Sequence, residues 1–268
     1  MAVNRFAYEK KLNLLINAYR QAAKTIAAQI KAAVEAGNLE RAQERVRQAA
    51  EIQQVLAELG ATTDTFAREI VQDAYYQSGQ ATAAKLPAVE VSMGASTFNA
   101  VSREAVDALA ESLVDGLRIS RLTVARTANK VFSDAAKQEV LQGLLGAQGS
   151  RRKVSKRIVE RLQLQGKTGF VDKAGKRWTL DHYAEMSART ITREAVTQGA
   201  TNRMASQGVE YCQVSTHSTS CPICLPHEGN IMRLDGTEDE TTTAALALPP
   251  FHPNCKHVVV PYIKGLSR

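Results

Sequence analysis

The feature that most constrains this chain is a helical periodicity in its N-terminal part. Between residues 6 and 36, apolar side chains recur every three or four positions, and the pattern resumes between residues 39 and 59. This spacing gathers the apolar side chains along one side of an α-helix. Aromatic residues make up only 5% of the chain, so such helices must meet through aliphatic and small side chains. In the first helix the stripe consists of Tyr8, Leu12, Leu15, Tyr19, Ala22, Ile26, Ile30 and Ala33.

Glycines and capping residues predict where these helices end. The short break at residues 37–38 predicts that the first two helices fold back as an antiparallel hairpin. Gly60 is predicted to end the second helix, and a third helix is predicted from the capping residues after it to about residue 84. Further helices are predicted from residue 96 to residue 145, with a break near Gly116.

The pattern changes after residue 150. A basic helix is predicted from Ser150, and residues 169–178 are typical of a β-hairpin with its turn at residues 172–175. Helical periodicity returns between residues 181 and 204, and residues 209–215 alternate as in a β-strand. The remainder is rich in loops, cysteines and histidines.

Those cysteines and histidines have the spacing of metal ligands. Cys221 and Cys224 are separated by two residues, so one tight turn can present both thiolates to a single ion, and a histidine and a cysteine repeat that spacing further on. In a reduced cytosolic chain, such clustering favours a metal over disulfides. The sequence therefore predicts a closed zinc site whose ligands are Cys221, Cys224, His252 and Cys255. Three spare histidines are possible replacements: His217, His227 and His257.

Other readings of this cluster stay open from the sequence. The cysteines would also suit a buried apolar core, and the histidines a hydrogen-bonded turn without metal. A catalytic zinc with an open coordination position is a third reading, with Glu228 nearby as a general base. Cys212 lies within the predicted strand and is expected to belong to the core.

Together these patterns predict a mainly α fold. An extended helical body, forming a hairpin or bundle, precedes a small α+β zinc-ligand module at the C-terminus. We predict that residues 1–95 form an N-terminal helical hairpin or bundle used for docking, and that residues 96–150 form central helices. Residues 151–268 would then hold the β-hairpin, one helix and the zinc-binding module.

The positive charge of the chain is concentrated in one block. The net charge is +7, and residues 150–203 hold thirteen Lys and Arg against five Asp and Glu, a local excess of +8. Such a block either contacts nucleic-acid phosphates or forms a solvated helix face. The residues predicted to contact DNA are Arg151, Arg152, Lys153, Lys156, Arg157, Arg189 and Arg193.

Several segments of the C-terminal half resemble a known family. Residues 178–190 (WTLDHYAEMSART) and 193–195 (REA) resemble the central motif of phage minor capsid proteins. Residues 208–217 (GVEYCQVSTH), 221–224 (CPIC) and 249–257 (PPFHPNCKH) resemble their C-terminal signature. The same module is similar to the phage Mu F-like head-morphogenesis domain, which also contains Cys-x-x-Cys and His-Pro-Asn-Cys.

The resemblance covers about residues 140 to 262, and residues 1–95 match only a generic helical body. Many F-like domains have Cys-Arg-Cys where this chain has Cys255, Lys256 and His257, which leaves the fourth ligand open. The resemblance implies a structural protein present in few copies per virion and added during head assembly. Its implied partners are the portal protein, the major capsid protein and packaged double-stranded DNA, bound without sequence preference. Travel with that DNA during ejection is a further role that the resemblance implies.

The implied location is the capsid interior near the portal, after synthesis in the host cytoplasm. No signal peptide and no apolar run approaching the roughly 20 residues of a membrane span occur in the sequence, so no membrane partner is expected. The chain has no Gly-rich phosphate loop, nucleophile elbow or paired-carboxylate motif, which favours a non-enzyme. The alternatives are a zinc-dependent nuclease and a zinc-stabilised DNA-binding protein.

The basic block generates a first testable prediction. If it contacts packaged DNA, binding to duplex DNA should be independent of sequence and steeply weakened by salt. Replacing Arg151, Arg152 and Lys153 by Gln should weaken binding and lower the log–log salt slope by about 0.9 for each lost phosphate contact. Fluorescence anisotropy over a salt series measures this slope. Absence of binding at low salt would show that the block is only a solvated face.

Overall fold

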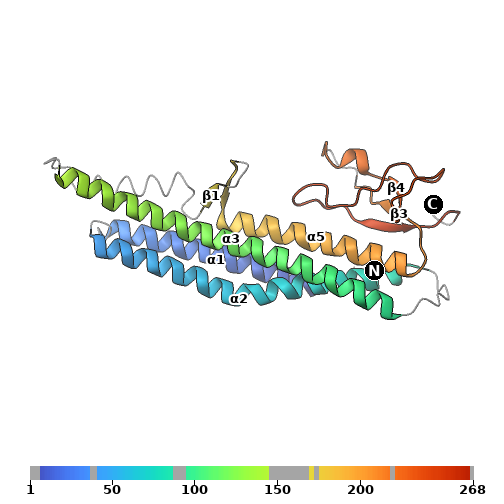
Figure 1. The fold of residues 1–268 in the computed structure, drawn as a ribbon, viewed down its shortest axis with the longest axis horizontal. Helices are drawn as coiled ribbons and strands as arrows, with labels where there is room; N and C mark the ends of the chain where they lie inside the picture. The colour runs from blue at the N-terminus through green and yellow to red at the C-terminus, as the bar shows by residue number, and fades with distance from the viewer. Residues whose placement is uncertain are drawn as a thin grey trace. The chain divides into compact units, whose positions relative to one another are not determined.

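The structure, a computed structural model, describes residues 7–36, 41–86, 95–144, 169–171, 175–217 and 221–265. Within these residues the fold is mainly helical, with a small C-terminal strand region, as the sequence predicts (Figure 1). Among the helices described, none is both long and apolar enough to cross a membrane. The long helices are α1 (Ala7–Glu35), α2 (Ala42–Ala83), α3 (Ala95–Leu144) and α5 (Leu180–Ser206).

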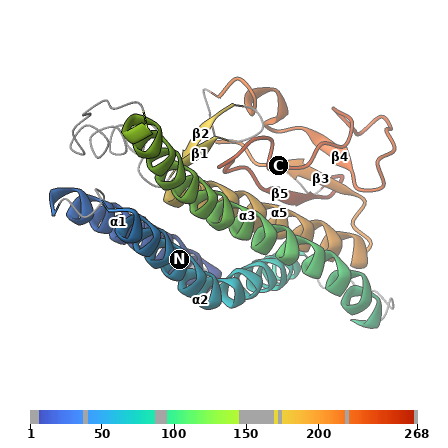
Figure 2. The same ribbon diagram turned by 60° about the vertical axis from the view of Figure 1, so that its left-hand side comes forward.

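Five short strands form two antiparallel sheets (Figure 2). The predicted hairpin is confirmed as β1 (Gly169–Val171) and β2 (Arg177–Thr179), paired with Phe170 opposite Trp178. The predicted strand near residues 209–215 is confirmed as the central strand of a three-stranded sheet in the order β4-β3-β5. These three strands are β3 (Tyr211–Val214), β4 (Ile231–Arg233) and β5 (Val259–Tyr262).

The apolar stripe predicted for the first helix is confirmed, because all eight of its side chains are buried. The chain divides into two compact units. One contains residues 1–13, 66–114 and 186–268, and the other contains residues 14–65 and 115–185. Each long helix contributes residues to both units.

The second of these units is organised around a buried arginine. Arg121 of α3 donates hydrogen bonds to the hydroxyl of Tyr19 in α1 (2.6 Å) and to a carboxylate oxygen of Asp64 in α2 (2.9 Å). The Arg121 side chain is only 8% exposed, and the Tyr19 side chain is fully buried. Removing one partner of a buried ion pair costs about 3–5 kcal/mol because the other charge stays buried and unpaired. One side chain therefore joins three helices.

The same arginine explains why one predicted helix break is wrong. Helix α2 continues from residue 42 to residue 83 through Gly60. A Cβ atom built at Gly60 would lie 2.9 Å from a terminal nitrogen of Arg121, so the glycine makes room for the guanidinium group. The break predicted near Gly116 is also wrong, since α3 is continuous from residue 95 to residue 144. Packing overrides the weak helix propensity of glycine at such positions.

The other unit is held by contacts of α2 with α1 and α5. Lys11 of α1 forms ion pairs with Glu69 (2.7 Å) and Asp73 (2.9 Å) of α2. Two further hydrogen bonds join α2 to α5: the Asn202 amide donates to the Tyr75 hydroxyl, and the Ser78 hydroxyl donates to the Val196 carbonyl oxygen. Together these contacts place α2 against both neighbours.

Two helix backbones approach each other closely at Gly199 of α5. A Cβ atom built there would lie 2.2 Å from the carbonyl oxygen of Tyr75 in α2. Only a glycine allows this approach, because a backbone oxygen cannot swing away as a flexible side chain can. Immediately beyond, Ala200 and Met204 of α5 pack against the buried face of the three-stranded sheet, which carries Cys212, Val214, Met232 and Val259. The end of α5 thus forms the platform for the C-terminal module.

This contact generates a stability prediction. Gly199→Ala should destabilise the protein by about 1–3 kcal/mol, the usual cost of overpacking, because helix backbones must separate. Gly60→Ala is the comparison: its methyl group meets the end of the Arg121 side chain, which can shift further than a backbone can, and alanine improves helix propensity by up to about 1 kcal/mol. Thermal unfolding followed by circular dichroism should show the larger loss for Gly199→Ala. Equal effects would contradict the close approach.

Candidate metal centre

The topology of the three-stranded sheet brings the predicted ligand segments together. Strand β3 pairs antiparallel with both β4 and β5. The end of β3 therefore lies beside the starts of β4 and β5. Residues 215–217 follow β3, residues 221–228 precede β4, and residues 252–257 precede β5. All three loops consequently meet at one end of the sheet.

The loop of residues 221–228 forms a tight turn around Cys221. The amide of Leu225 donates to the carbonyl oxygen of Cys221 (2.9 Å), which closes the turn. Backbone amides of Cys224 and Ile223 donate to the Cys221 sulfur and lower the pKa of this thiol. A turn with inward-pointing amides stabilises a thiolate, the form that binds metals. Cys224 is buried, while Ile223 and Leu225 on either side are 52% and 56% exposed.

The loop of residues 252–257 is shaped by an unusual backbone conformation. Asn254 has a φ of 64°, in the left-handed region that asparagine tolerates better than other non-glycine residues. The amide of Cys255 donates to the carbonyl oxygen of His252 (3.1 Å). This turn directs the side chains of His252 and Cys255 toward the loop of residues 221–228.

Three of the four predicted ligands, Cys221, Cys224 and His252, lie within 4.8 Å of one another, and Cys255 joins them through Cys224. Nε2 of His252 lies 3.6 Å from the sulfur of Cys221 and 2.9 Å from that of Cys224, and the sulfurs of Cys224 and Cys255 are 3.8 Å apart. Zinc–sulfur bonds of about 2.3 Å and zinc–nitrogen bonds of about 2.0 Å at tetrahedral angles imply ligand separations of roughly 3.5–3.8 Å. The Cys221–His252 and Cys224–Cys255 separations match those between two ligands of one tetrahedral zinc ion, and the Cys224–His252 separation is shorter.

A fifth donor joins the cluster. Nδ1 of His257 lies 3.6 Å from the sulfur of Cys255, and His257 is buried. The donors form two overlapping groups, whose ligand atoms lie within 4.8 Å of one another: Cys221, Cys224 and His252, and Cys224, Cys255 and His257. Cys224 belongs to both groups and is therefore the centre of the cluster.

The other two candidate histidines belong to neither group. The ring of His227 stacks on Phe251 with centroids 4.0 Å apart. The ring of His217 meets His257 edge to face, and its Nε2 lies 2.9 Å from the hydroxyl of Ser215. Among the described residues, both histidines therefore support the cluster from outside.

Glu228 has a role that the sequence did not predict. Its carboxylate accepts hydrogen bonds from Nε2 of His257 and from the backbone amide of His217, both 2.8 Å long. Burial lowers the pKa of His257, but the bond to Glu228 and the neighbouring Cys255 outweigh burial and raise it. A carboxylate on one ring nitrogen fixes the tautomer and leaves the other nitrogen free to bind a metal. From the sequence, Glu228 is only a candidate general base near the cysteines; the structure places it beside His257 instead.

The electrostatics of the thiols call for a cation. Burial and the adjacent Cys255 and Cys221 raise the pKa of Cys224 to about 12. For Cys255, burial raises the pKa, but backbone amides of Phe251 and His257 more than compensate and lower it. Three thiolates so close together repel one another unless a metal ion neutralises them. Sulfur and imidazole donors in a closed, largely buried set suit zinc.

Cys212 does not belong to this cluster. It lies fully buried on β3 within the apolar core, as expected. Burial raises the pKa of its thiol to about 11. A thiol in this state is a poor nucleophile and a poor ligand, which makes Cys212 a suitable internal comparison for the cluster cysteines.

The predicted DNA-contacting residues are only partly described. Arg151, Arg152, Lys153, Lys156 and Arg157 lie outside the described residues, as does the predicted basic helix. Arg189 and Arg193 are half-buried on α5. Burial raises the pKa of Tyr8, and the nearby charge of Arg193 opposes that rise, so Arg193 lies close to α1. DNA contact by these residues stays a prediction.

Comparison with known families decides the identity of the chain. A family model described as phage minor capsid protein 2 matches residues 9–268. The chain belongs to this family. The match extends well beyond the C-terminal motifs, since it also covers the helices that the sequence motifs left unassigned. No curated protein and no solved structure matches the chain.

For this minor capsid protein, the cluster generates a metal prediction. We expect about one zinc ion per chain by elemental analysis of protein purified without chelator. Cys224→Ser should abolish binding, because both donor groups lose a ligand. Cys212→Ala, the matched control, should keep the metal despite losing some core packing. Zinc retention by Cys224→Ser, or absence of any transition metal from the unaltered protein, would contradict the assignment.

Proposed function

We propose that this chain is a structural component of the phage head that docks on the portal and the inner capsid surface. Membership of the minor capsid family over nearly the whole chain is the observation that carries the proposal. That membership supports a structural role in the virion. The portal and the major capsid protein are the proposed partners, and the capsid interior near the portal is the proposed location.

In this proposal zinc makes the C-terminal module rigid. The ligand cluster joins two loops, residues 221–228 and residues 252–257, beside a sheet whose strands have only three or four residues. Structural zinc contributes on the order of 10 kcal/mol to folding in small domains of this kind. Cys221, Cys224, Cys255 and either His252 or His257 would hold the ion. The ion would also fix the exposed side chains of Ile223 and Leu225 for contact with a partner.

DNA is the third proposed partner. The excess of +8 between residues 150 and 203 supports contact with phosphates. A protein in the head interior meets packaged DNA at high local concentration, so weak contacts that ignore base sequence suffice. Such contacts are also compatible with release of the protein alongside DNA during ejection.

A zinc-dependent nuclease is the second candidate function. The hydrogen-bonded pair of Glu228 and His257 is the observation in its favour, because acid–histidine pairs also serve as general bases. However, the side chains of His257 and Glu228 are only 3% and 8% exposed, and the other ring nitrogen of His257 faces Cys255. This arrangement favours a ligand held in place over a base that reaches substrate. Zinc-dependent cleavage of plasmid DNA, lost in Glu228→Gln, would support the nuclease.

The docking proposal predicts where the protein is found after assembly. Co-expressed with the portal protein of its own phage, the chain should co-purify with portal rings, and it should be present in purified heads. Cys224→Ser should reduce its incorporation at least several-fold, because the module loses its rigidity, whereas Cys212→Ala should be incorporated normally. Quantitative mass spectrometry of heads measures both variants. A chain found only in the unassembled fraction would refute the structural role.

A further inference from the structure

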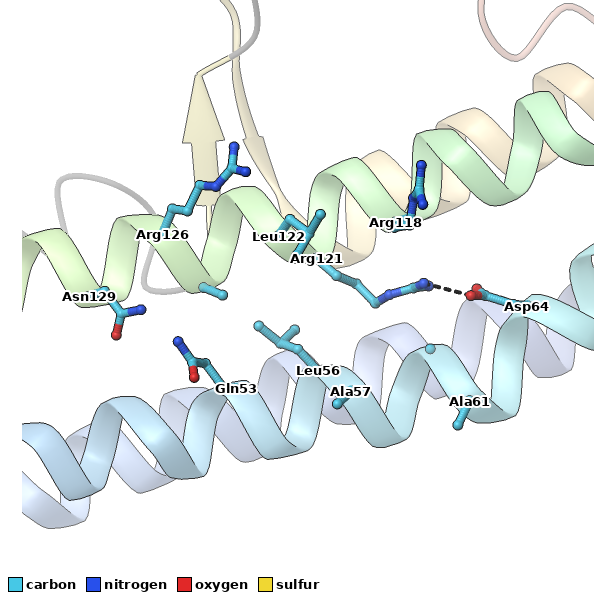
Figure 3. A pocket seen from close by; sticks show the side chains of 12 residues that line it. Gln53, Leu56, Ala57, Ala61, Asp64, Arg118, Arg121, Leu122, Arg126 and Asn129 are labelled. Atoms are coloured by element: carbon cyan, nitrogen blue, oxygen red, sulfur yellow. Dashed lines mark hydrogen bonds and ion pairs between the residues drawn. The ribbon is translucent and has the colours of Figure 1, made fainter.

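A groove lies between α2 and α3 in the unit formed by residues 14–65 and 115–185 (Figure 3). Its volume is about 470 Å³. The α2 wall presents Gln53, Ala57 and Ala61, and the α3 wall presents Arg118, Leu122 and Arg126. On each wall these side chains recur every four residues. The groove therefore follows the axes of two helices.

The floor and walls of the groove are largely apolar. Leu56 is buried at its base, whereas Leu122 is 47% exposed. The alanines of α2 keep that wall low, so another backbone can approach closely. Rows of side chains at four-residue spacing form the ridges that accept a third helix in helix packing. The shape thus suits a helix with an apolar stripe better than an extended peptide.

The charge around the groove is positive. The lining contains three arginines and one acidic residue, Asp64, which is already bound to Arg121. Among the described residues, Arg118 forms an exposed ion pair with Asp115, one turn away on its own helix. Such surface pairs contribute little. Between residues 117 and 133, α3 carries four Arg and Lys and no Asp or Glu. The rim on the α3 side is therefore cationic.

We propose that this groove binds an acidic amphipathic helix from another protein of the phage head. Apolar side chains of that helix would cover Leu56, Ala57 and Leu122, and its acidic side chains would meet Arg118 and Arg126. DNA would use the arginines but leave the apolar floor uncovered, so the observations favour a protein helix. The proposal rests on the proposed function in one respect, namely that the partner belongs to the same particle.

The test uses the full chain and two synthetic helical peptides of about 18 residues, or about five turns. One peptide has a leucine stripe flanked by glutamates, and the other has lysines in place of the glutamates. Fluorescence anisotropy measures binding. We expect the acidic peptide to bind and the lysine peptide to bind at least about ten-fold more weakly, because charge complementarity sets the preference.

Variants identify the surface. Ala57→Trp should fill the groove and abolish binding, and Arg126→Glu should weaken binding of the acidic peptide and strengthen that of the lysine peptide. The control is Ala28→Trp, an equal change at an exposed alanine of α1 outside the groove lining, which should have no effect. Circular dichroism checks that each variant is folded. Because Arg126→Glu tests charge without filling space, it decides the case even if Ala57→Trp proves unstable.

Four results would overturn the proposal. These are no binding of the acidic peptide, equal binding by Ala57→Trp, competition for the groove by a DNA duplex, and self-association of the chain that Ala57→Trp abolishes. The last two would assign the groove to nucleic acid or to a second copy. Peptide binding is measured on the purified chain, and incorporation is measured separately in heads. Failure of the peptide to bind would therefore refute the groove proposal and leave the docking role standing. Conversely, loss of incorporation with intact peptide binding would refute the docking role alone.

Discussion

The helical unit formed by residues 14–65 and 115–185 depends on one buried cation. Arg121 satisfies its guanidinium through Tyr19 and Asp64, so three helices that are distant in sequence share one side chain. In a chain with few aromatic residues, such a polar bond supplies the specificity that large core side chains provide elsewhere. The guanidinium occupies the space that Gly60 leaves in the middle of α2. The path of α2 through Gly60 and the position of the arginine are therefore linked.

In the other unit, too, a glycine inside a helix makes room for a neighbouring group. Gly199 brings α5 against the Tyr75 backbone, and the residues that follow it carry the three-stranded sheet. The sheet in turn determines where the metal ligands lie. Each strand has only three or four residues, so it offers few hydrogen bonds of its own. The ligand cluster at one end of the sheet and the α5 platform on its face hold the module from two sides.

The sequence predicted the stripe of α1, the β1–β2 hairpin, α5 and β3 because each follows from a local period or turn. It failed at Gly60 and Gly116, where glycine normally marks an end. A glycine inside a helix costs only about 1 kcal/mol relative to alanine, and the free energy of a buried contact easily exceeds that cost. From the sequence, Glu228 is a candidate general base near the cysteines and has no predicted partner. Its bonds to His257 and His217 depend on the pairing of strands that are distant in sequence.

By itself, the sequence determined the helical character of the chain, its zinc-type ligand spacing and its likeness to minor capsid proteins. These properties depend on short stretches of sequence, because a helical period and the two-residue spacing of paired ligands are each complete within one or two turns. Only the tertiary structure decided which candidate donors converge: five do, and His217 and His227 do not. The physical reason is strand pairing. Because β4 and β5 both run antiparallel to β3, loops some thirty residues apart meet at one end of the sheet, a relation that no local spacing contains.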